Sequence, residues 1–377
     1  MYITFLQYVG LAICAMTISS CVLPDTPEQV SGSEWETLRG FNIHPQTENA
    51  VLDTIIENTG ANLIRLSLTN TGRLMSKTPP YEFNEGAFQD LNRILDWAET
   101  REVRVLIDPH TTPGTRSDYT IYPDDELWQD KTLQEHLIRL WVRIANEQKH
   151  RGKVIAGYDL LNEPSTPDIS KCGDPWNELI AVLVDTIRAT GSSHPIIIEP
   201  AGRKIGGECD GSGGRYIDRK AGLKDLILPN DENIVVSPHF YEPTEFAFQG
   251  VEGNPLGYSY PGLVGETRWD RDQISRSLQP IRDFQIANPD VPVLIGEFSA
   301  SRGAGPDGDV YLRDLIELIE AEGWSWAYHD FRGYVAWDPE RPYTSGPPFS
   351  IEAVTRSWDN LRMDLLREYY IKNGQAR

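Results

Sequence analysis

The sequence predicts an α/β fold, a single (β/α)8 TIM barrel, from three observations. Eight short apolar runs alternate with amphipathic segments, as buried parallel strands alternate with helices. No Gly-rich phosphate loop follows the first run, which disfavours a doubly wound open sheet. Polar residues gather just after the apolar runs, where a barrel places its functional residues. With 377 residues, 40% of them hydrophobic, the chain is long enough for one such barrel.

The predicted strands are short and end at turn or helix-stop signals. In chain order they cover residues 38–43, 61–68, 103–108, 154–161, 195–199, 234–238, 291–296 and 323–328. Each is mostly apolar, which is typical of a strand covered by helices on its outer face.

The predicted helices lie between the strands and follow helical periodicity. The segment 85–102, for example, places Phe88, Leu91 and Leu95 on one face. A proline at position 280 predicts a break within the segment 271–289. Further helices are expected over 133–148, 176–191, 310–323 and 351–374.

The charge of the chain restricts its partners. There are 35 basic and 56 acidic side chains, giving a formal net charge of −21. A polyanion such as nucleic acid is therefore disfavoured, and a neutral substrate fits better. We expect a monomer, with no cofactor and no metal.

The first residues resemble an export segment, because positions 1–21 contain no charged side chain. The motif "ISSC" resembles a lipobox, which predicts cleavage of residues 1–20 and lipidation of Cys21. The alternatives are an uncleaved anchor or cleavage by an ordinary signal peptidase. Residues 21–34 would form a tether and 35–377 the catalytic domain, giving a protein that is secreted, periplasmic or lipid-anchored to the outer membrane. In such a compartment Cys172 and Cys209 form either a disulfide or two separate thiols.

Two glutamates stand at the ends of predicted strands. Glu163 closes "VIAGYDLLNEP" and Glu297 closes "VPVLIGEF". The carboxyl ends of barrel strands meet at one face, so the two carboxyl groups can face one sugar. Glycoside hydrolysis needs one carboxylic acid and one carboxylate, and Asn162 beside Glu163 can bind the sugar 2-hydroxyl. The competing interpretation is structural, with each glutamate paired to Arg65 or capping a helix.

Five motifs together resemble glycoside hydrolase family 5, the cellulase-like members of the retaining (β/α)8 clan. In chain order they are "IDPHTTPG", "GYDLLNEP", "PHFYEP", "IGEF" and "SWAY". At His329 and Asp330 the chain has other residues than the aromatic residue and acid that many relatives carry.

The resemblance implies a role for each matching residue. Glu163 would be the acid/base and Glu297 the nucleophile. The substrate-binding and supporting residues implied are Arg65, His110, Asn162, His239, Tyr241 and Trp326, with Trp326 as a stacking floor for the sugar.

The implied function is a retaining, endo-acting β-1,4-glucan hydrolase. Mannan, xyloglucan and β-1,3-glucan are alternative substrates within the family. A metal-dependent barrel hydrolase using the strand-end histidines and a non-catalytic carbohydrate-binding barrel are alternatives from other classes. The aromatic residues of segment 242–269 either bind sugar rings or form a local core.

Overall fold

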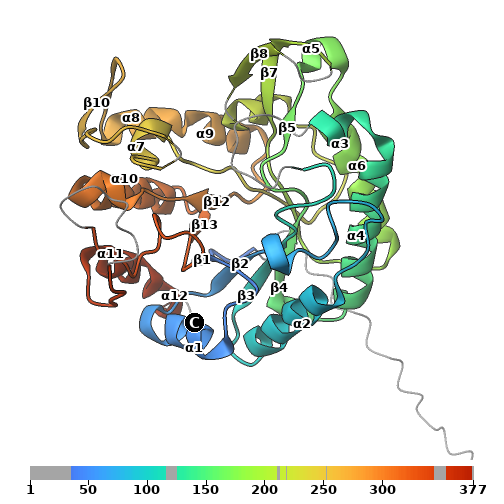
Figure 1. Ribbon diagram of the computed structural model, residues 1–377, viewed down its shortest axis with the longest axis horizontal. Coiled ribbons are helices and arrows are strands. Elements are labelled where there is room, and N and C mark those ends of the chain that lie inside the picture. The colour runs from blue at the N-terminus through green and yellow to red at the C-terminus, as the bar shows by residue number, and fades with distance from the viewer. Residues whose placement is uncertain are drawn as a thin grey trace, which may run out of the picture.

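The computed structural model describes residues 35–115, 125–209, 213–217, 219–251, 253–343 and 354–375. Its centre is an eight-stranded parallel sheet surrounded by helices (Figure 1). All eight predicted strands are present. They are β1 (Arg39–Ile43), β2 (Leu63–Ser67), β3 (Arg104–Asp108), β4 (Ile155–Asp159), β6 (Ile196–Ile198), β9 (Ile234–Val236), β12 (Leu294–Phe298) and β13 (Ser325–Tyr328).

The sheet closes on itself, which confirms the predicted barrel. Its strand order is β12-β13-β1-β2-β3-β4-β6-β9. Isolated parallel bridges between Val236 and Val293 and between Phe240 and Phe298 join the two end strands. The carboxyl ends of the strands therefore meet at one face of the barrel.

The helices cover the outer side of the barrel. Several begin at an Asn or Asp whose side chain accepts a backbone N–H, the usual chemistry of a helix start. The predicted break near Pro280 is confirmed, because α8 ends at Ser277 and α9 begins at Gln279. The principal helices are α1 (Asn49–Thr59), α2 (Glu85–Glu99), α4 (Lys131–Gln148), α6 (Pro175–Ala189), α8 (Arg271–Ser277), α9 (Gln279–Ala287), α10 (Gly305–Ala321) and α11 (Leu361–Tyr370). Shorter ones are α3 (Asp125–Gln129), α5 (Ile169–Cys172), α7 (Thr244–Ala247), α12 (Lys372–Gln375) and a 3-10 segment, η4 (Arg219–Asp225).

The last helix is shorter than the sequence predicts. The expected segment 351–374 becomes α11, which begins only after the Asn360 cap, since Asn360 Oδ1 accepts the backbone N–H groups of Arg362 and Met363. The hydroxyl of Tyr370 donates to the carbonyl of Gly40, so α11 packs beside β1 (Figure 1). The last long helix of the described chain therefore lies against its first barrel strand. None of the helices in the described part is both long and apolar enough to cross a membrane.

The barrel interior is layered. One buried side chain from or next to each barrel strand contributes to an apolar layer, made of Leu38, Leu63, Leu106, Ala156, Ile197, Val235, Leu294 and Ala327. Side chains of a strand alternate between its two faces, so residues two positions further on also point inward. On four of the strands or just past them, these are Arg65, Asp108, Glu199 and His329, all buried. The polar layer therefore lies directly beyond the apolar one, toward the carboxyl ends.

The same alternation overturns the role expected for Trp326. Because Ala327 points into the barrel, Trp326 points out toward the helices. It is fully buried, its indole N–H donates to Glu320 Oε1 at 2.8 Å, and its ring lies 5.0 Å from that of Tyr370. The expectation that Trp326 forms a sugar-stacking floor is wrong, because it belongs to the core between barrel and helices.

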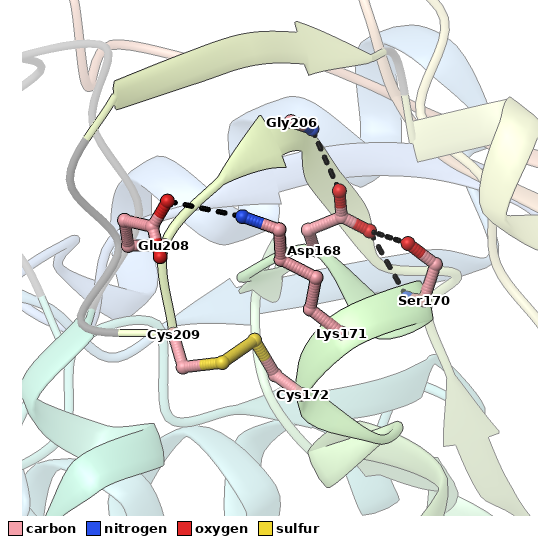
Figure 2. Close-up of a disulfide and its surroundings, with 7 residues drawn as sticks. All are labelled: Asp168, Ser170, Lys171, Cys172, Gly206, Glu208 and Cys209. Carbon is pink, nitrogen blue, oxygen red and sulfur yellow. Dashed lines mark hydrogen bonds and ion pairs between the residues drawn. A yellow bond between two sulfur atoms is a disulfide. The ribbon is translucent and has the colours of Figure 1, made fainter.

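A disulfide between Cys172 and Cys209 resolves the alternative left open by the sequence. It fastens α5 to the end of a three-stranded sheet made of β5 (Ser165–Thr166), β7 (Gly202–Gly207) and β8 (Gly213–Ile217). Asp168 strengthens the same connection, because its carboxylate accepts the backbone N–H of Gly206 at 2.6 Å and the hydroxyl of Ser170 at 2.6 Å (Figure 2). The disulfide thus joins the segment that follows β4 to the segment that follows β6.

A separate two-stranded hairpin is formed by β10 (Gly262–Val264) and β11 (Thr267–Trp269).

Removing this disulfide should destabilise the protein. The two cysteines are 37 residues apart, so the bridge restricts the unfolded chain substantially. We expect the double variant Cys172→Ser/Cys209→Ser to lose about 2–4 kcal/mol of free energy of unfolding, measured by urea denaturation. Dithiothreitol should lower the midpoint of the wild type and leave that of the variant unchanged. Equal midpoints of oxidised wild type and variant would contradict the prediction.

Candidate active site

The two glutamates predicted to meet do lie together at the carboxyl face of the barrel. Glu297 is on β12, and Glu163 lies beyond the end of β4 in a left-handed backbone conformation with φ 47°. One carboxylate oxygen of each, together with a ring nitrogen of His239, lie within 4.8 Å of one another. The Glu163 side chain is 24% exposed and that of Glu297 only 6%. Glu163 is therefore the more accessible of two closely facing carboxyl groups.

Arg65 is the hub of the polar layer. Its guanidinium is fully buried, and Nη1 lies 2.6 Å from Glu297 Oε1. Nη2 donates to Asn162 Oδ1 at 2.9 Å. Burial lowers the pKa of Arg65, but the surrounding carboxylates outweigh it and raise the pKa well above its ordinary value. The remaining contacts are with Asn42 at 2.8 Å, Asp159 at 2.9 Å, Glu199 at 3.0 Å and Asp108 at 3.1 Å.

Glu297 is held as an anion. Burial would raise its pKa, but the charges of His329, His239 and Arg65 lower the pKa well below its ordinary value. Its second oxygen accepts the hydroxyl hydrogen bond of Tyr241 at 3.0 Å. The pKa of Tyr241 is raised by burial and by the neighbouring carboxylates, so its hydroxyl remains a donor. Both oxygens of Glu297 are thus oriented by donors.

His239 lies between the acidic groups. Its Nδ1 lies 2.9 Å from Glu163 Oε1 and 3.6 Å from Glu297 Oε2. Burial lowers the pKa of His239, but Glu199, Glu297 and Glu163 together raise it to about 10. Gly296 makes room for the ring, because a Cβ at that position would lie 3.0 Å from Nε2. At neutral pH His239 is therefore an imidazolium that donates to Glu163.

His110 is oriented in a similar way. Its Nδ1 lies 2.7 Å from Asp108 Oδ2, and Asp108 is also an ion-pair partner of Arg65. Burial lowers the pKa of His110, while the charge and hydrogen bond of Asp108 raise it to a net increase. The ring is consequently fixed beside the polar layer with Nε2 as its other hydrogen-bonding atom.

The structure brings seven of the eight predicted residues into one cluster and leaves Trp326 outside it. It also adds groups to which the sequence analysis assigned no role. Glu199 and Asn42 both contact Arg65, and His329 Nδ1 lies 3.5 Å from Glu297 Oε2. One sequence signal for Glu199 is that "IIIEP" repeats the pattern of "LLNEP", a glutamate and a proline closing an apolar run.

The aromatic segment 242–269 serves mainly as a local core among its described residues. Phe246 and Tyr260 are buried and pack against Tyr311 at 5.4 and 5.5 Å between ring centroids. Phe248 instead packs against Trp337 and Tyr241, beside the cluster. Most of this segment thus supports the site rather than offering free rings.

The cluster also has the composition of a metal site, since Glu163, His239 and Glu297 each offer one ligand atom. A metal requires a neutral imidazole nitrogen with a free lone pair. The raised pKa of His239 and its carboxylate neighbours favour the protonated ring instead. These three side chains therefore fit a protonated histidine placed between two carboxyl groups better than they fit a metal site.

Comparison with known proteins agrees with this arrangement. The family model "Cellulase (glycosyl hydrolase family 5)" matches residues 26–334. The chain belongs to glycosyl hydrolase family 5. Within the family it is similar to endoglucanase C of Acetivibrio thermocellus, 26% identical over 289 residues, which are 67% of this chain and 76% of that protein. A β-xylosidase of Phanerodontia chrysosporium is 30% identical over 312 residues, 75% of this chain and 57% of that protein.

Solved structures of this family share the barrel. The endoglucanase Cel5A from Thermotoga maritima superposes with a TM-score of 0.63 at 25% identity, covering 81% of this chain and 93% of that chain. The chain is thus a glycosyl hydrolase of the endoglucanase-like type, with polysaccharides as its class of substrate.

Proposed function

We propose that this glycosyl hydrolase is a retaining, endo-acting β-glucanase that cleaves β-1,4-glucan by double displacement. The observation that carries the mechanism is the close approach of Glu163 and Glu297, which have carboxylate oxygens within 4.8 Å of one another. Retaining enzymes hold their carboxyl groups about 5–5.5 Å apart, whereas inverting enzymes need roughly 6.5–9.5 Å to admit a water. The relatives named as endoglucanases support cleavage within a glucan chain, and the match to the cellulase family model supports the β-1,4 linkage.

In the first step, a carboxylate oxygen of Glu297 attacks the anomeric carbon. The glycosidic C–O bond breaks, and Glu163 transfers its proton to the leaving oxygen. The products are a glycosyl ester on Glu297 and a sugar with a free hydroxyl. The depressed pKa of Glu297 keeps it ionised and ready to attack.

In the second step, water replaces the leaving sugar. Glu163, now a carboxylate, takes a proton from the water as its oxygen attacks the anomeric carbon. The ester bond to Glu297 breaks, and both carboxyl groups return to their initial states. Two inversions at one carbon give net retention.

The other residues act by orientation and charge. Arg65 and Tyr241 hold Glu297, and His239 donates to Glu163. The amide oxygen of Asn162 accepts from Arg65, which leaves its NH2 group to donate to the sugar 2-hydroxyl. His110 lies on the same face and supplies a further contact for the sugar at the cleaved position.

A second candidate is exo-acting hydrolysis of a β-xyloside or β-1,3-glucoside. It is favoured by similarity to the β-xylosidase and to a glucan 1,3-β-glucosidase of Wickerhamomyces anomalus. Mannan and xyloglucan are further substrates to include.

We also propose that the protein is exported and that Cys21 is lipidated. The uncharged first 21 residues support export, and the Cys172–Cys209 disulfide is typical of an oxidising compartment. Residues 1–34, including the predicted signal and tether, lie outside the described residues.

A substrate panel tests the proposed function. Purified protein would be incubated with carboxymethylcellulose, mannan, xyloglucan, β-1,3-glucan and aryl β-xylosides, with and without EDTA. We expect the fastest release of reducing ends from the β-1,4-glucan, unaffected by EDTA. Early-time proton NMR should show the β-anomer first, and an α-anomer as the initial product would exclude double displacement. Loss of activity in EDTA with recovery on adding zinc would favour the metal-dependent alternative.

A further inference from the structure

Glu199 is a third buried glutamate at the carboxyl face, and double displacement by two carboxylates gives it no task. It follows the last residue of β6, and only 1% of it is exposed. A buried carboxylate is costly unless it is fully paired, so its contacts indicate what it does.

Both oxygens of Glu199 contact the machinery around Glu163. Oε2 accepts the backbone N–H of Glu163 at 2.7 Å. Oε1 lies 3.2 Å from Nε2 of His239, whose Nδ1 lies 2.9 Å from the carboxylate of Glu163. Oε1 also accepts a hydrogen bond from Arg65 at 3.0 Å.

We propose that Glu199 is a positioning residue for the acid/base, which it holds at two points, the backbone of Glu163 and the ring of His239. This inference rests on the proposed function, in which Glu163 is the acid/base. Glu199, His239 and Glu163 form a carboxylate–imidazolium–carboxyl chain in which the outer carboxylate fixes the ring, as the aspartate of a catalytic triad fixes its histidine.

The backbone contact is needed because Glu163 has an unusual conformation. A φ of 47° is uncommon for a residue other than glycine and persists only when its surroundings enforce it. The charged hydrogen bond from Glu163 N–H to Glu199 is one such constraint, and charge-assisted bonds are stronger than neutral ones. Glu199 therefore holds the backbone of Glu163 in the conformation from which its side chain reaches the site.

The ring contact fixes the protonation state of His239. The acidic groups facing this ring are Glu163 and Asp159 from the β4 segment, Glu199 after β6 and Glu297 on β12. Among them Glu199 contributes most to the raised pKa of His239. Without the charge of Glu199, whose Oε1 lies 3.2 Å from Nε2, the ring should lose its proton at lower pH and would no longer be paired on that side.

A competing role for Glu199 is only to neutralise Arg65, which would affect Glu297 rather than Glu163. Asp159 provides the matched control. It is fully buried and contacts Arg65 Nε at 2.9 Å. Its other carboxylate oxygen has no hydrogen-bond partner among the described residues. Both carboxylates pair with Arg65, but among the described residues it is Glu199 that accepts the backbone N–H of Glu163 and lies within ion-pair distance of His239. Comparing Glu199→Gln with Asp159→Asn therefore separates the two roles.

The test compares aryl β-cellobiosides with poor and good leaving groups. Phenol needs a proton from the acid as it leaves, whereas 2,4-dinitrophenol hardly does, and kcat/KM reports the first step. For Glu199→Gln we expect kcat/KM to fall about 100-fold on the phenyl substrate and less than about 5-fold on the dinitrophenyl substrate. Asp159→Asn should lower both by similar factors. NMR of the imidazole nitrogens should place the His239 titration at lower pH in Glu199→Gln than in wild type.

Several outcomes would overturn the inference. An equal loss on both substrates, or an unchanged titration of His239, would show that Glu199 does not act through Glu163. The same would follow if, in the double variant Glu163→Gln/Glu199→Gln, Glu199→Gln lowered kcat/KM on the phenyl substrate by as large a factor as it does in the wild type. If Glu199→Gln does not fold, Glu199→Asp keeps the charge but shortens its reach, and the same dependence on leaving group is expected. Failure of the wild type to hydrolyse either substrate would instead refute the proposed function.

Discussion

Replacing Glu297 by glutamine should abolish turnover, lowering kcat on the preferred glucan by about 10⁴-fold or more. The amide cannot form the ester intermediate and carries no charge to stabilise the cationic sugar carbon. Arg65, whose Nη1 lies 2.6 Å from Oε1 of Glu297 in the wild type, would stay charged beside the neutral amide. Reducing-end assays over hours, with protein at high concentration, would measure the residual rate.

Glu340→Gln is the matched control for this variant. Glu340 is also buried, at 1% exposure, but pairs with Arg332 outside the cluster. Its kcat should stay within a few-fold of wild type, whatever happens to stability. Azide separates the two glutamates further. With Glu297→Ala it should give an α-glycosyl azide, and with Glu163→Ala a β-glycosyl azide formed through the intermediate. Turnover of Glu297→Gln at the wild-type rate would refute the nucleophile assignment.

The sequence predicted the barrel and most of the cluster because both depend on regular geometry. Parallel strands bring their carboxyl ends to one face whatever the intervening helices do, so polar residues after the apolar runs had to meet. Glu163, Asn162, Tyr241 and Glu297 were identifiable on that ground. The distance between the two carboxyl groups could not be predicted from the sequence, because it depends on the left-handed backbone conformation of Glu163 after β4.

Position along the chain does not by itself give the direction of a side chain. Trp326 and His329 are both near the end of β13. His329 is two residues from the inward-pointing Ala327 and so points into the barrel, whereas Trp326 is one residue from it and points outward. Glu199 also lies at the carboxyl end of a strand, but that position alone does not show which side chains it contacts. The disulfide stayed open because the approach of Cys172 to Cys209 depends on irregular segments, which hydrophobic periodicity does not describe.

Replacing Arg65 by methionine should strongly destabilise the folded protein. The guanidinium is fully buried and pairs with Asp108, Asp159, Glu199 and Glu297. Breaking one buried ion pair by removing one partner typically costs about 3–5 kcal/mol. Since four carboxylates share Arg65, we expect a loss at the upper end of that range or beyond, measured by urea denaturation. Arg101→Met is the control, because the pair of Arg101 with Asp53 is largely exposed and should contribute about 1 kcal/mol or less.

The pH dependence of this loss distinguishes lost charge from lost packing. Without Arg65 the buried carboxylates should have higher pKa values in the folded state than in the unfolded state. The folded variant then binds more protons, so its stability falls as the pH rises. The difference from wild type should therefore be larger at pH 8 than at pH 5, where protonation relieves part of the repulsion. A difference independent of pH would mean that Arg65 stabilises the barrel by filling space, and that the network does not depend on its charge.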